Sequence, residues 1–402
     1  MFAGEGERSS RSGGVQAILS KRHMILIFGA LLAVYVFCRA ILPLRLKWGW
    51  KALLAVLLAV AAFKFHLLHL FGGPMFFSPV LPEGVLLAAA WLFSVLFLFF
   101  FLLLAADVAR LLYLLVLFCL RKKRTERFRI IGNRVNLALL VFAAVLATVG
   151  MAGGTGVPRV KEETISVNHL PDGADGLAVA VLADLHVDGI TRADRIRKIV
   201  ERTNALNPDI VIIAGDFVDG TVPVHGDDLR PLADLKARYG VFGVPGNHEY
   251  YSGYEEWMEF LPTLGIRMLH NEHVQTGGGA VVLAGVTDPV AGIMGKEEPD
   301  IRKALAGAPE KGVRILASHQ PRLAPEAAAH GVDLQVSGHT HGGMIAGIDR
   351  LVARFNEGFV SGLYTVGGMK LYVSNGAGIW NGFPIRIGVP SEIVLIRLRK
   401  EE

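Results

Sequence analysis

Residues 177–186 read Leu-Ala-Val-Ala-Val-Leu-Ala-Asp-Leu-His, and residues 210–219 read Ile-Val-Ile-Ile-Ala-Gly-Asp-Phe-Val-Asp. In both stretches a short apolar run, rich in branched side chains, ends abruptly in acidic or imidazole side chains. Such runs predict buried strands in an α/β layer domain. The polar side chains come just past the strand ends, which is the edge of an open α/β sheet where ligand sites form.

The same arrangement occurs five times in this half of the chain. Three further apolar runs, at 241–244, 314–317 and 333–336, also lead directly into polar residues. One such coincidence would mean little, but five of them predict that the polar residues converge on one site.

Two amphipathic helices are predicted between these strands. The first is capped by Thr191, carries its apolar residues on one face and stops before Pro208. The second carries Leu229, Leu232 and Leu235 and closes before strand 241–244. Alternating strands and helices indicate the α/β class.

The polar residues at the strand ends form one chemical set. In chain order they are Asp184, His186, Asp216, Asp219, Asn247, His248, Glu249, His319, His339 and His341. Carboxylate and amide oxygens mixed with imidazoles, without a thiolate, suit Mn, Fe, Zn or Co better than Ca or Cu(I). Seven candidate metal ligands exceed the need of one ion with an open reaction position, but they can serve two ions when one carboxylate bridges.

Glycines beside these residues, and the spacing of the residues, also indicate a ligand site. Gly215, Gly246 and Gly338 directly precede candidate ligands, and a residue without Cβ allows sharp turns and close approach to a ligand. In an extended chain, residues two positions apart project to the same side, so Asp184 and His186 are expected to converge, as are His339 and His341.

Taken together, these blocks resemble the calcineurin-like metallophosphoesterase family, and more narrowly its bacterial membrane-associated branch. That branch carries a Gly-His-Thr-His-Gly-Gly block, which stands at residues 338–343 here. The resemblance covers about residues 177–398 and includes the C-terminal block at 372–376. It implies a layered β-sandwich flanked by helices, preceded in this chain by an all-α transmembrane region.

The resemblance also implies a ligand set for two metal ions. The first ion would be held by Asp184, His186, Asp216 and His341. Asp216 would bridge to a second ion, which would also be held by Asn247, His319 and His339. Two such ions bind phosphate oxygens and lower the pKa of a bridging water, giving a hydroxide that attacks phosphorus.

Further residues follow from the same resemblance. His248 would donate a proton to the leaving oxygen, with Asp219 or Glu249 orienting its ring. Arg386, in a glycine-rich C-terminal loop, would either clamp a phosphate or form a plain surface salt bridge.

The two halves of the chain differ in charge. Residues 1–155 hold 17 Lys/Arg against 5 Asp/Glu, and the remainder holds 24 against 31. An acidic catalytic half repels polyanions, so no nucleic acid is expected as a partner. We predict an N-terminal tail over 1–23, a membrane region over 24–155 and a metallophosphoesterase catalytic domain over 157–402.

Four apolar stretches are long enough to cross a bilayer, namely 24–42, 52–70, 85–104 and 135–151. The third continues apolar to Leu120 past Asp107 and Arg110, so it is either one long tilted helix or a span plus an interfacial segment. Asp107 and Arg110 are spaced as an i,i+3 pair, which marks either charges near the headgroups or a buried functional site. Cys38 and Cys119 lie in apolar runs and form no metal knuckle.

Loop charge predicts how these spans are oriented. Basic residues cluster between the third and fourth spans at 121–134, and such clusters are normally retained in the cytoplasm. The catalytic domain follows the fourth span and is therefore expected outside the cytoplasm, on an integral cell-membrane protein.

Two function classes remain in view. The first is hydrolysis of a phosphodiester, phosphomonoester or pyrophosphate, with a membrane or envelope lipid-type substrate favoured because the spans hold the domain at a bilayer. The alternative is a non-catalytic metal-binding or scaffold domain at the membrane. The lipid bilayer is the expected partner, and no protein partner can be deduced.

Overall fold

The computed structural model describes residues 24–73, 78–122, 127–168, 170–380 and 382–401, which fall into two compact units. The helical unit contains residues 24–152 together with Gly382–Pro384. The α/β unit contains Gly153–Asn381 and Ile385–Glu402.

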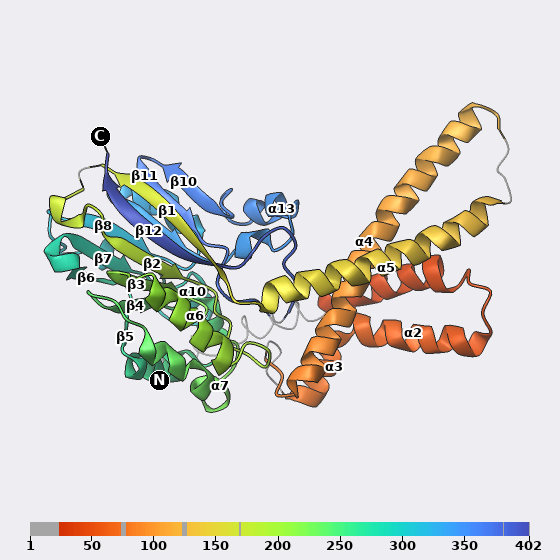
Figure 1. Cartoon of the computed structure of the whole chain (residues 1–402), viewed down its shortest axis with the longest axis horizontal. Coiled ribbons are helices and arrows are strands. Elements are labelled where there is room, and N and C mark those ends of the chain that lie inside the picture. Colours follow the sequence, from red (N-terminus) through yellow and green to blue (C-terminus); the bar gives the residue numbers. More distant parts are fainter. Residues whose placement is uncertain (1–23, 74–77, 123–126, 169, 381, 402) are drawn as a thin grey trace, which may run out of the picture. The chain divides into compact units, whose positions relative to one another are not determined.

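Two six-stranded sheets form the centre of the α/β unit (Figure 1). The first sheet has the order β1 (Arg159–Val167), β12 (Glu392–Lys400), β2 (Ala178–Leu182), β3 (Ile210–Ala214), β4 (Val241–Val244) and β5 (Ile266–Met268). The second has the order β10 (Gly362–Val366), β11 (Met369–Val373), β9 (Leu334–Ser337), β8 (Val313–Ala317), β7 (Val281–Gly285) and β6 (Glu272–Thr276). The strands that lead into the polar blocks run parallel within each sheet.

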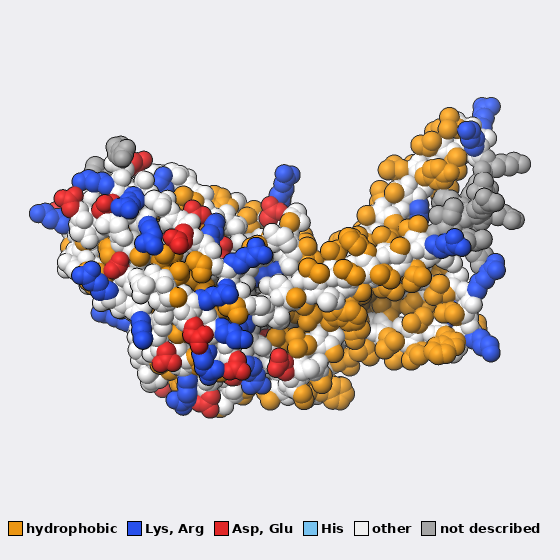
Figure 2. Space-filling view, in the orientation of Figure 1, with side chains coloured by type: hydrophobic (Ala, Val, Ile, Leu, Met, Phe, Trp, Pro, Cys, Tyr) orange, Lys and Arg blue, Asp and Glu red, His pale blue; other side chains and the backbone are white. Residues whose placement is uncertain are grey.

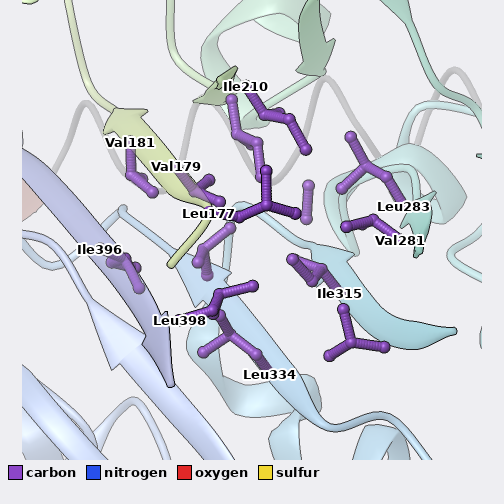
Figure 3. Packing of buried hydrophobic residues seen from close by; sticks show 14 of the residues in the cluster. Leu177, Val179, Val181, Ile210, Val281, Leu283, Ile315, Leu334, Ile396 and Leu398 are labelled. Carbon is purple, nitrogen blue, oxygen red and sulfur yellow. The ribbon is translucent and has the colours of Figure 1, made fainter. Parts of the chain in front are cut away.

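The main core lies between the two sheets. Val179 and Ile210 from the first sheet belong to the same buried cluster as Leu283, Ile315 and Leu334 from the second (Figure 3). Alternate residues of β2 and β3 face this core, and the others face helices on the outside. Both faces of these strands are therefore apolar, which is why they appear in the sequence as unbroken hydrophobic runs.

Helices cover the outer face of each sheet. The first sheet packs against α6 (Ala193–Ala205), α7 (Val222–Leu229) and α9 (Tyr254–Phe260). The second packs against α11 (Ile301–Ala304) and α12 (Ala324–Ala329). The remaining α-helices of this unit are α8 (Asn247–Tyr251), α10 (Val290–Ile293) and α13 (Asp349–Arg354). The predicted class, an α/β layered sandwich flanked by helices, is confirmed.

The predicted strands agree closely with the structure. Strands β3 and β4 have the predicted bounds, β8 begins one residue earlier, β9 is shifted by one residue, and β2 is one residue shorter at each end than the predicted 177–183. The predicted cap of α6 is wrong, because Arg192 occupies the N-cap position without a side-chain hydrogen bond. The Thr191 hydroxyl instead accepts a hydrogen bond from Arg195.

The second predicted helix is also interrupted. Helix α7 ends at Leu229, and residues Arg230–Asp234 form a separate 3-10 turn. Pro231 explains the break, because proline has no N–H to donate to the preceding turn and its ring crowds the carbonyl there.

Within the described residues, the helical unit contains five helical segments. They are Met24–Ile41, whose last turn Phe37–Ile41 is π-helical, α2 (Trp48–Ala62), α3 (Lys64–Gly72), α4 (Glu83–Cys119) and α5 (Arg127–Thr155). Among the described residues, three helices are long and apolar enough to cross a membrane, or four if the bent pair α2 and α3 forms one span. That pair bends by 72°, so the predicted second span is broken near Phe63.

The long third run forms one unbroken helix. Helix α4 has 37 residues, which corresponds to a length of about 55 Å. Of the two alternatives for this run, one long helix or a span plus an interfacial segment, the structure has the long helix.

The surface of the helical unit fits a bilayer. Figure 2 shows apolar side chains covering these helices, with Lys and Arg gathered at one end. Large apolar residues such as Phe118 and Leu137 are exposed there, which is costly in water and favourable in hydrocarbon.

Candidate metal centre

The strand ends place the predicted ligands. Asp184 follows β2, Asp216 follows β3 and Asn247 follows β4. In the second sheet, His319 follows β8 and His339 follows β9. Sequence-distant residues therefore reach one edge of the sandwich.

The backbone at these positions is unusual. Asp184, His186, Asp216, His339 and His341 all have positive φ values, between 45° and 71°. Side-chain-bearing residues rarely adopt this left-handed region, and such residues concentrate at functional sites. The expected reason for the convergence of Asp184 and His186 is therefore wrong, because tight left-handed turns and not extended chain bring them together.

Three groups of candidate ligand atoms result, and two of them consist only of predicted metal ligands. The first cluster is Asp184, His186 and His341, and the second cluster is Asp216, His319 and His339. Within each cluster the ligand atoms lie within 4.8 Å of one another.

The Asp216 carboxylate reaches both clusters. Its Oδ2 lies 3.1 Å from Nε2 of His319 and 3.6 Å from Nε2 of His186. Asn247 joins the second cluster, since its Oδ1 lies 3.2 Å from Nε2 of His319. The structure thus brings all seven predicted ligands together, with Asp216 in the position expected of a bridge.

Hydrogen bonding around His319 tests whether a cation fits. Its Nδ1 lies 2.8 Å from the carbonyl oxygen of Ala214, and because a carbonyl only accepts, Nδ1 carries a proton. In the neutral ring, the Nε2 lone pair then faces the oxygens of Asp216 and Asn247. Without a metal, burial lowers the pKa of His319 but the nearby carboxylates more than offset this and raise it, so a proton on Nε2 satisfies these acceptors. A bound metal cation would take the place of that proton, which is typical of a metal-binding histidine.

His186 repeats the pattern in the first cluster. Its Nδ1 lies 3.1 Å from a carboxylate oxygen of Asp219, which leaves Nε2 directed at the cluster. Nε2 of His341 lies 3.1 Å away from that nitrogen. Buried imidazole and carboxylate groups of this kind fit the predicted Mn, Fe, Zn or Co ions.

Asp219 connects the first cluster to His248. One oxygen of Asp219 accepts from His186, and the other pairs with Nδ1 of His248. Nε2 of His248 is left 4.0 Å from Oδ2 of Asp216. The ring of His248 therefore lies beside both clusters, with its second nitrogen directed toward them.

The buried charges of Asp219, His186 and His248 shift one another's pKa values. Burial raises the pKa of Asp219, but His248 and His186 more than offset it and hold the pKa at about 2. Burial lowers the pKa of His248, but the carboxylates of Asp219 and Asp216 raise it to about 9. In the metal-free protein His248 consequently keeps its proton at neutral pH, which is the state that a general acid needs.

Glu249 has a different place from the one expected. Its carboxylate accepts backbone N–H groups from Gly246, Asp216, Phe217 and Val218. Of the two expected partners of the His248 ring, Asp219 is the one that pairs with its Nδ1. Glu249 instead ties together the loops that follow β3 and β4.

Asp288 is a buried acid that the sequence analysis missed. It lies three residues past β7, and both of its oxygens accept from Nε2 of Gln320 at 3.0 Å. Gln320 directly follows His319. The sequence does contain a signal for Asp288, because β7 is a sixth apolar run that leads into a carboxylate.

Two glycines allow the close packing. A Cβ on Gly246 would lie 2.2 Å from Oδ1 of Asp216, and one on Gly338 would lie 2.4 Å from Oδ2 of Asp184. No side chain fits at either distance, so these positions exclude other residues for a steric reason.

Arg386 is buried beside the first cluster. Its Nη2 donates to the carbonyl oxygens of Asn375 and Gly378, at 2.6 and 2.9 Å, and Nη1 donates to that of His341 at 3.2 Å. Burial lowers its pKa to about 10. In the described part of the chain it pairs with no acidic side chain, so the surface salt-bridge alternative is wrong, and its contact with substrate stays a prediction.

A two-sheet sandwich with buried clusters of His and Asp at one edge is the arrangement of a metal-dependent hydrolase. Comparisons with known proteins narrow this class. Residues 177–343 match the family model described as calcineurin-like phosphoesterase. The chain belongs to the calcineurin-like metallophosphoesterase family.

Three relatives support this membership. A metallophosphoesterase of Helicobacter pylori is 40% identical over 251 residues, covering 62% of this chain and 66% of the relative. One of Campylobacter jejuni is 32% identical over 303 residues, covering 75% and 78%. A zebrafish transmembrane protein with a metallophosphoesterase domain is 34% identical over 278 residues, covering 66% and 63%. The matches thus span slightly less than two thirds of the first and third relatives.

Proposed function

We propose that this chain is a phosphoesterase that uses two metal ions, one in each cluster, with Asp216 as the shared ligand. The observation that carries the proposal is the position of the Asp216 carboxylate, within 3.6 Å of a histidine nitrogen from each cluster. The ligands of the first ion are Asp184, His186, Asp216 and His341, and those of the second are Asp216, Asn247, His319 and His339. The block at residues 338–343 supports placing the chain in the membrane-associated branch of the family.

The metals and the protein contribute different chemistry. When bound, two such ions supply positive charge that binds phosphate oxygens and makes water more acidic. The ligand residues hold that charge at a fixed position in a buried site, so little reorganisation is needed during reaction.

His248 is proposed as the proton donor to the leaving oxygen. Asp219 holds its Nδ1, which fixes the ring with Nε2 directed toward the clusters, 4.0 Å from Oδ2 of Asp216. The same carboxylate holds His186, so one residue aligns both a metal ligand and the acid.

The substrate is proposed to be a phosphodiester, phosphomonoester or pyrophosphate of a membrane or envelope lipid type. The support is the helical unit, whose apolar helices suit a bilayer and would keep the enzyme at a membrane. The proposed orientation puts the catalytic unit outside the cytoplasm, because the basic loops around 45–51 and 121–134 belong on the cytoplasmic side.

Hydrolysis assays on the purified full chain test this function. The chain, loaded with Mn or Zn, should hydrolyse an aryl phosphodiester or an aryl phosphomonoester, and then release phosphate or headgroup from one class in a panel of membrane-lipid extracts. Failure on both aryl esters, combined with sites that take up no metal, would leave the scaffold alternative. Activity on aryl esters without activity on any lipid would remove the lipid substrate alone.

A further inference from the structure

A charged cluster lies inside the helical unit and has no part in the proposed reaction. Oδ2 of Asp107 accepts from the Tyr35 hydroxyl at 2.8 Å and from Nε of Arg39 at 2.6 Å. Oδ1 accepts from Arg39 and, at 2.8 Å, from Nη1 of Arg110. The i,i+3 pair suggested by the sequence is therefore formed, and Arg39 of another helix joins it.

The cluster carries an excess of positive charge. It contains two guanidinium groups and one carboxylate, and the only other acidic side chain among the described residues of this unit is Glu83, at the far end of α4. Charge within a membrane segment is costly, so an uncompensated positive group favours an anionic partner.

Asn136 connects this cluster to a cavity. Its Oδ1 accepts from Nη2 of Arg110 at 2.6 Å, and its Nδ2 donates to the carbonyl oxygen of Arg39 at 3.1 Å. Arg39 lies in the π-helical turn Phe37–Ile41, and such turns are frequent at functional sites. Asn136 also lines the cavity itself.

The cavity suits a hydrocarbon chain. It measures about 500 Å³ and is lined almost entirely by apolar side chains, among them Leu58, Leu96, Phe99 and Leu140. The polar amides on its wall are Asn133 and Asn136. Its volume falls within the range of small-molecule sites.

We propose that this cavity and the charged cluster bind one bilayer phospholipid with an anionic headgroup. An acyl chain fills the cavity, and the phosphate lies against Arg39 and Arg110. The depth of Arg39 in the membrane suits contact with a lipid headgroup. Arg39 is two residues from the end of the helix Met24–Ile41, and the adjoining loop carries Arg45 and Lys47. The Arg39 side chain remains 40% exposed and is therefore accessible to a headgroup.

Lipid retention by the wild-type chain is the primary test. The full chain is purified in mild detergent with EDTA, so that hydrolysis cannot remove the probe. It is then offered phosphatidylglycerol or phosphatidylcholine with identical acyl chains, and retained lipid is counted by native mass spectrometry. We expect phosphatidylglycerol to be retained about five- to tenfold more. Equal retention of the two lipids, or retention of neither, would overturn the proposal.

Two pairs of variants locate the site. Ala144→Phe fills the cavity and should abolish the retention of phosphatidylglycerol, whereas Val145→Phe, on the exposed side of the same helix, should not. Arg39→Gln should remove the preference for phosphatidylglycerol, and Arg39→Lys should keep it. Wild-type retention by Ala144→Phe, or a preference unchanged in Arg39→Gln, would contradict the site. Because the experiment measures lipid binding in the absence of metal, a negative result would not bear on the proposed hydrolysis.

Discussion

Asp219 accepts hydrogen bonds from two histidines that are proposed to do different work. His186 belongs to the first cluster, whereas His248 stands outside both ligand sets with its Nε2 directed toward them. The pattern of apolar strands followed directly by polar residues identified these residues in the sequence. It could not supply their left-handed backbone, because positive φ at Asp184 or Asp216 is imposed by tertiary contacts and not by local sequence.

The role of His248 gives the first prediction. His248→Ala should lower kcat by about 10²- to 10⁴-fold, because a general acid contributes that much, while leaving metal content unchanged. His330→Ala, at an exposed helix end, is the matched control and should behave like wild type. The measurements are steady-state kinetics and metal analysis. Full activity in His248→Ala would remove its role as the acid.

Asp288 gives a prediction about pH. Burial raises the pKa of its carboxyl from 3.8 to about 6, so between these values the folded state binds a proton that the unfolded state has released. This contribution to stability is present at low pH and is lost as the pH rises toward 6. Asp288→Asn should therefore have a melting temperature that falls less than that of wild type between pH 4 and pH 6, on the same metal-free full chain. Parallel curves for the two proteins would contradict the shift.

At the scale of elements, the loops after the strands are held by the close packing of Gly246 against Asp216 and of Gly338 against Asp184. Continuous apolar runs predicted the strands well, because burial on both faces leaves an unmistakable pattern. The helix after Val222 was harder, since the apolar spacing of Leu229 and Leu232 continues through Pro231 while the helix does not. Asp288 was overlooked although it also follows a buried strand.

Gly246 tests this steric fit. In Gly246→Ala the new Cβ would meet the Asp216 carboxylate at 2.2 Å, so Asp216 must move away from both clusters. We expect reduced metal content and activity, with a loss of stability of about 1–3 kcal/mol from overpacking. Gly173→Ala, whose Cβ would have its nearest neighbour at 3.4 Å, is the control. Normal metal content in Gly246→Ala would show that the close approach is dispensable.

At the scale of the whole molecule, the sequence separates an apolar basic half from an acidic half with α/β character. It does not predict the order of strands in the two sheets, because the pairings join distant segments such as β1 with β12 and β11 with β9. The length of α4 was also open, because an apolar run with two charges is compatible with one helix or two.

Membrane topology gives a prediction at this scale. Protease added to intact spheroplasts should cleave the catalytic unit, because the basic loops are expected in the cytoplasm and the last span leads outward. A protease-sensitive site inserted in the 121–134 loop serves as the control and should be cut only after lysis. A catalytic unit that stays shielded until lysis would reverse the orientation.

Metal stoichiometry tests the central claim most directly. The purified full chain, incubated with Mn²⁺, desalted and analysed by inductively coupled plasma mass spectrometry, should retain about two ions, as a site with a bridging carboxylate requires. Asp216→Ala should lose most of both, and His330→Ala should lose neither. Wild-type protein that binds no metal, or Asp216→Ala that still binds two ions, would contradict a centre built on a shared carboxylate.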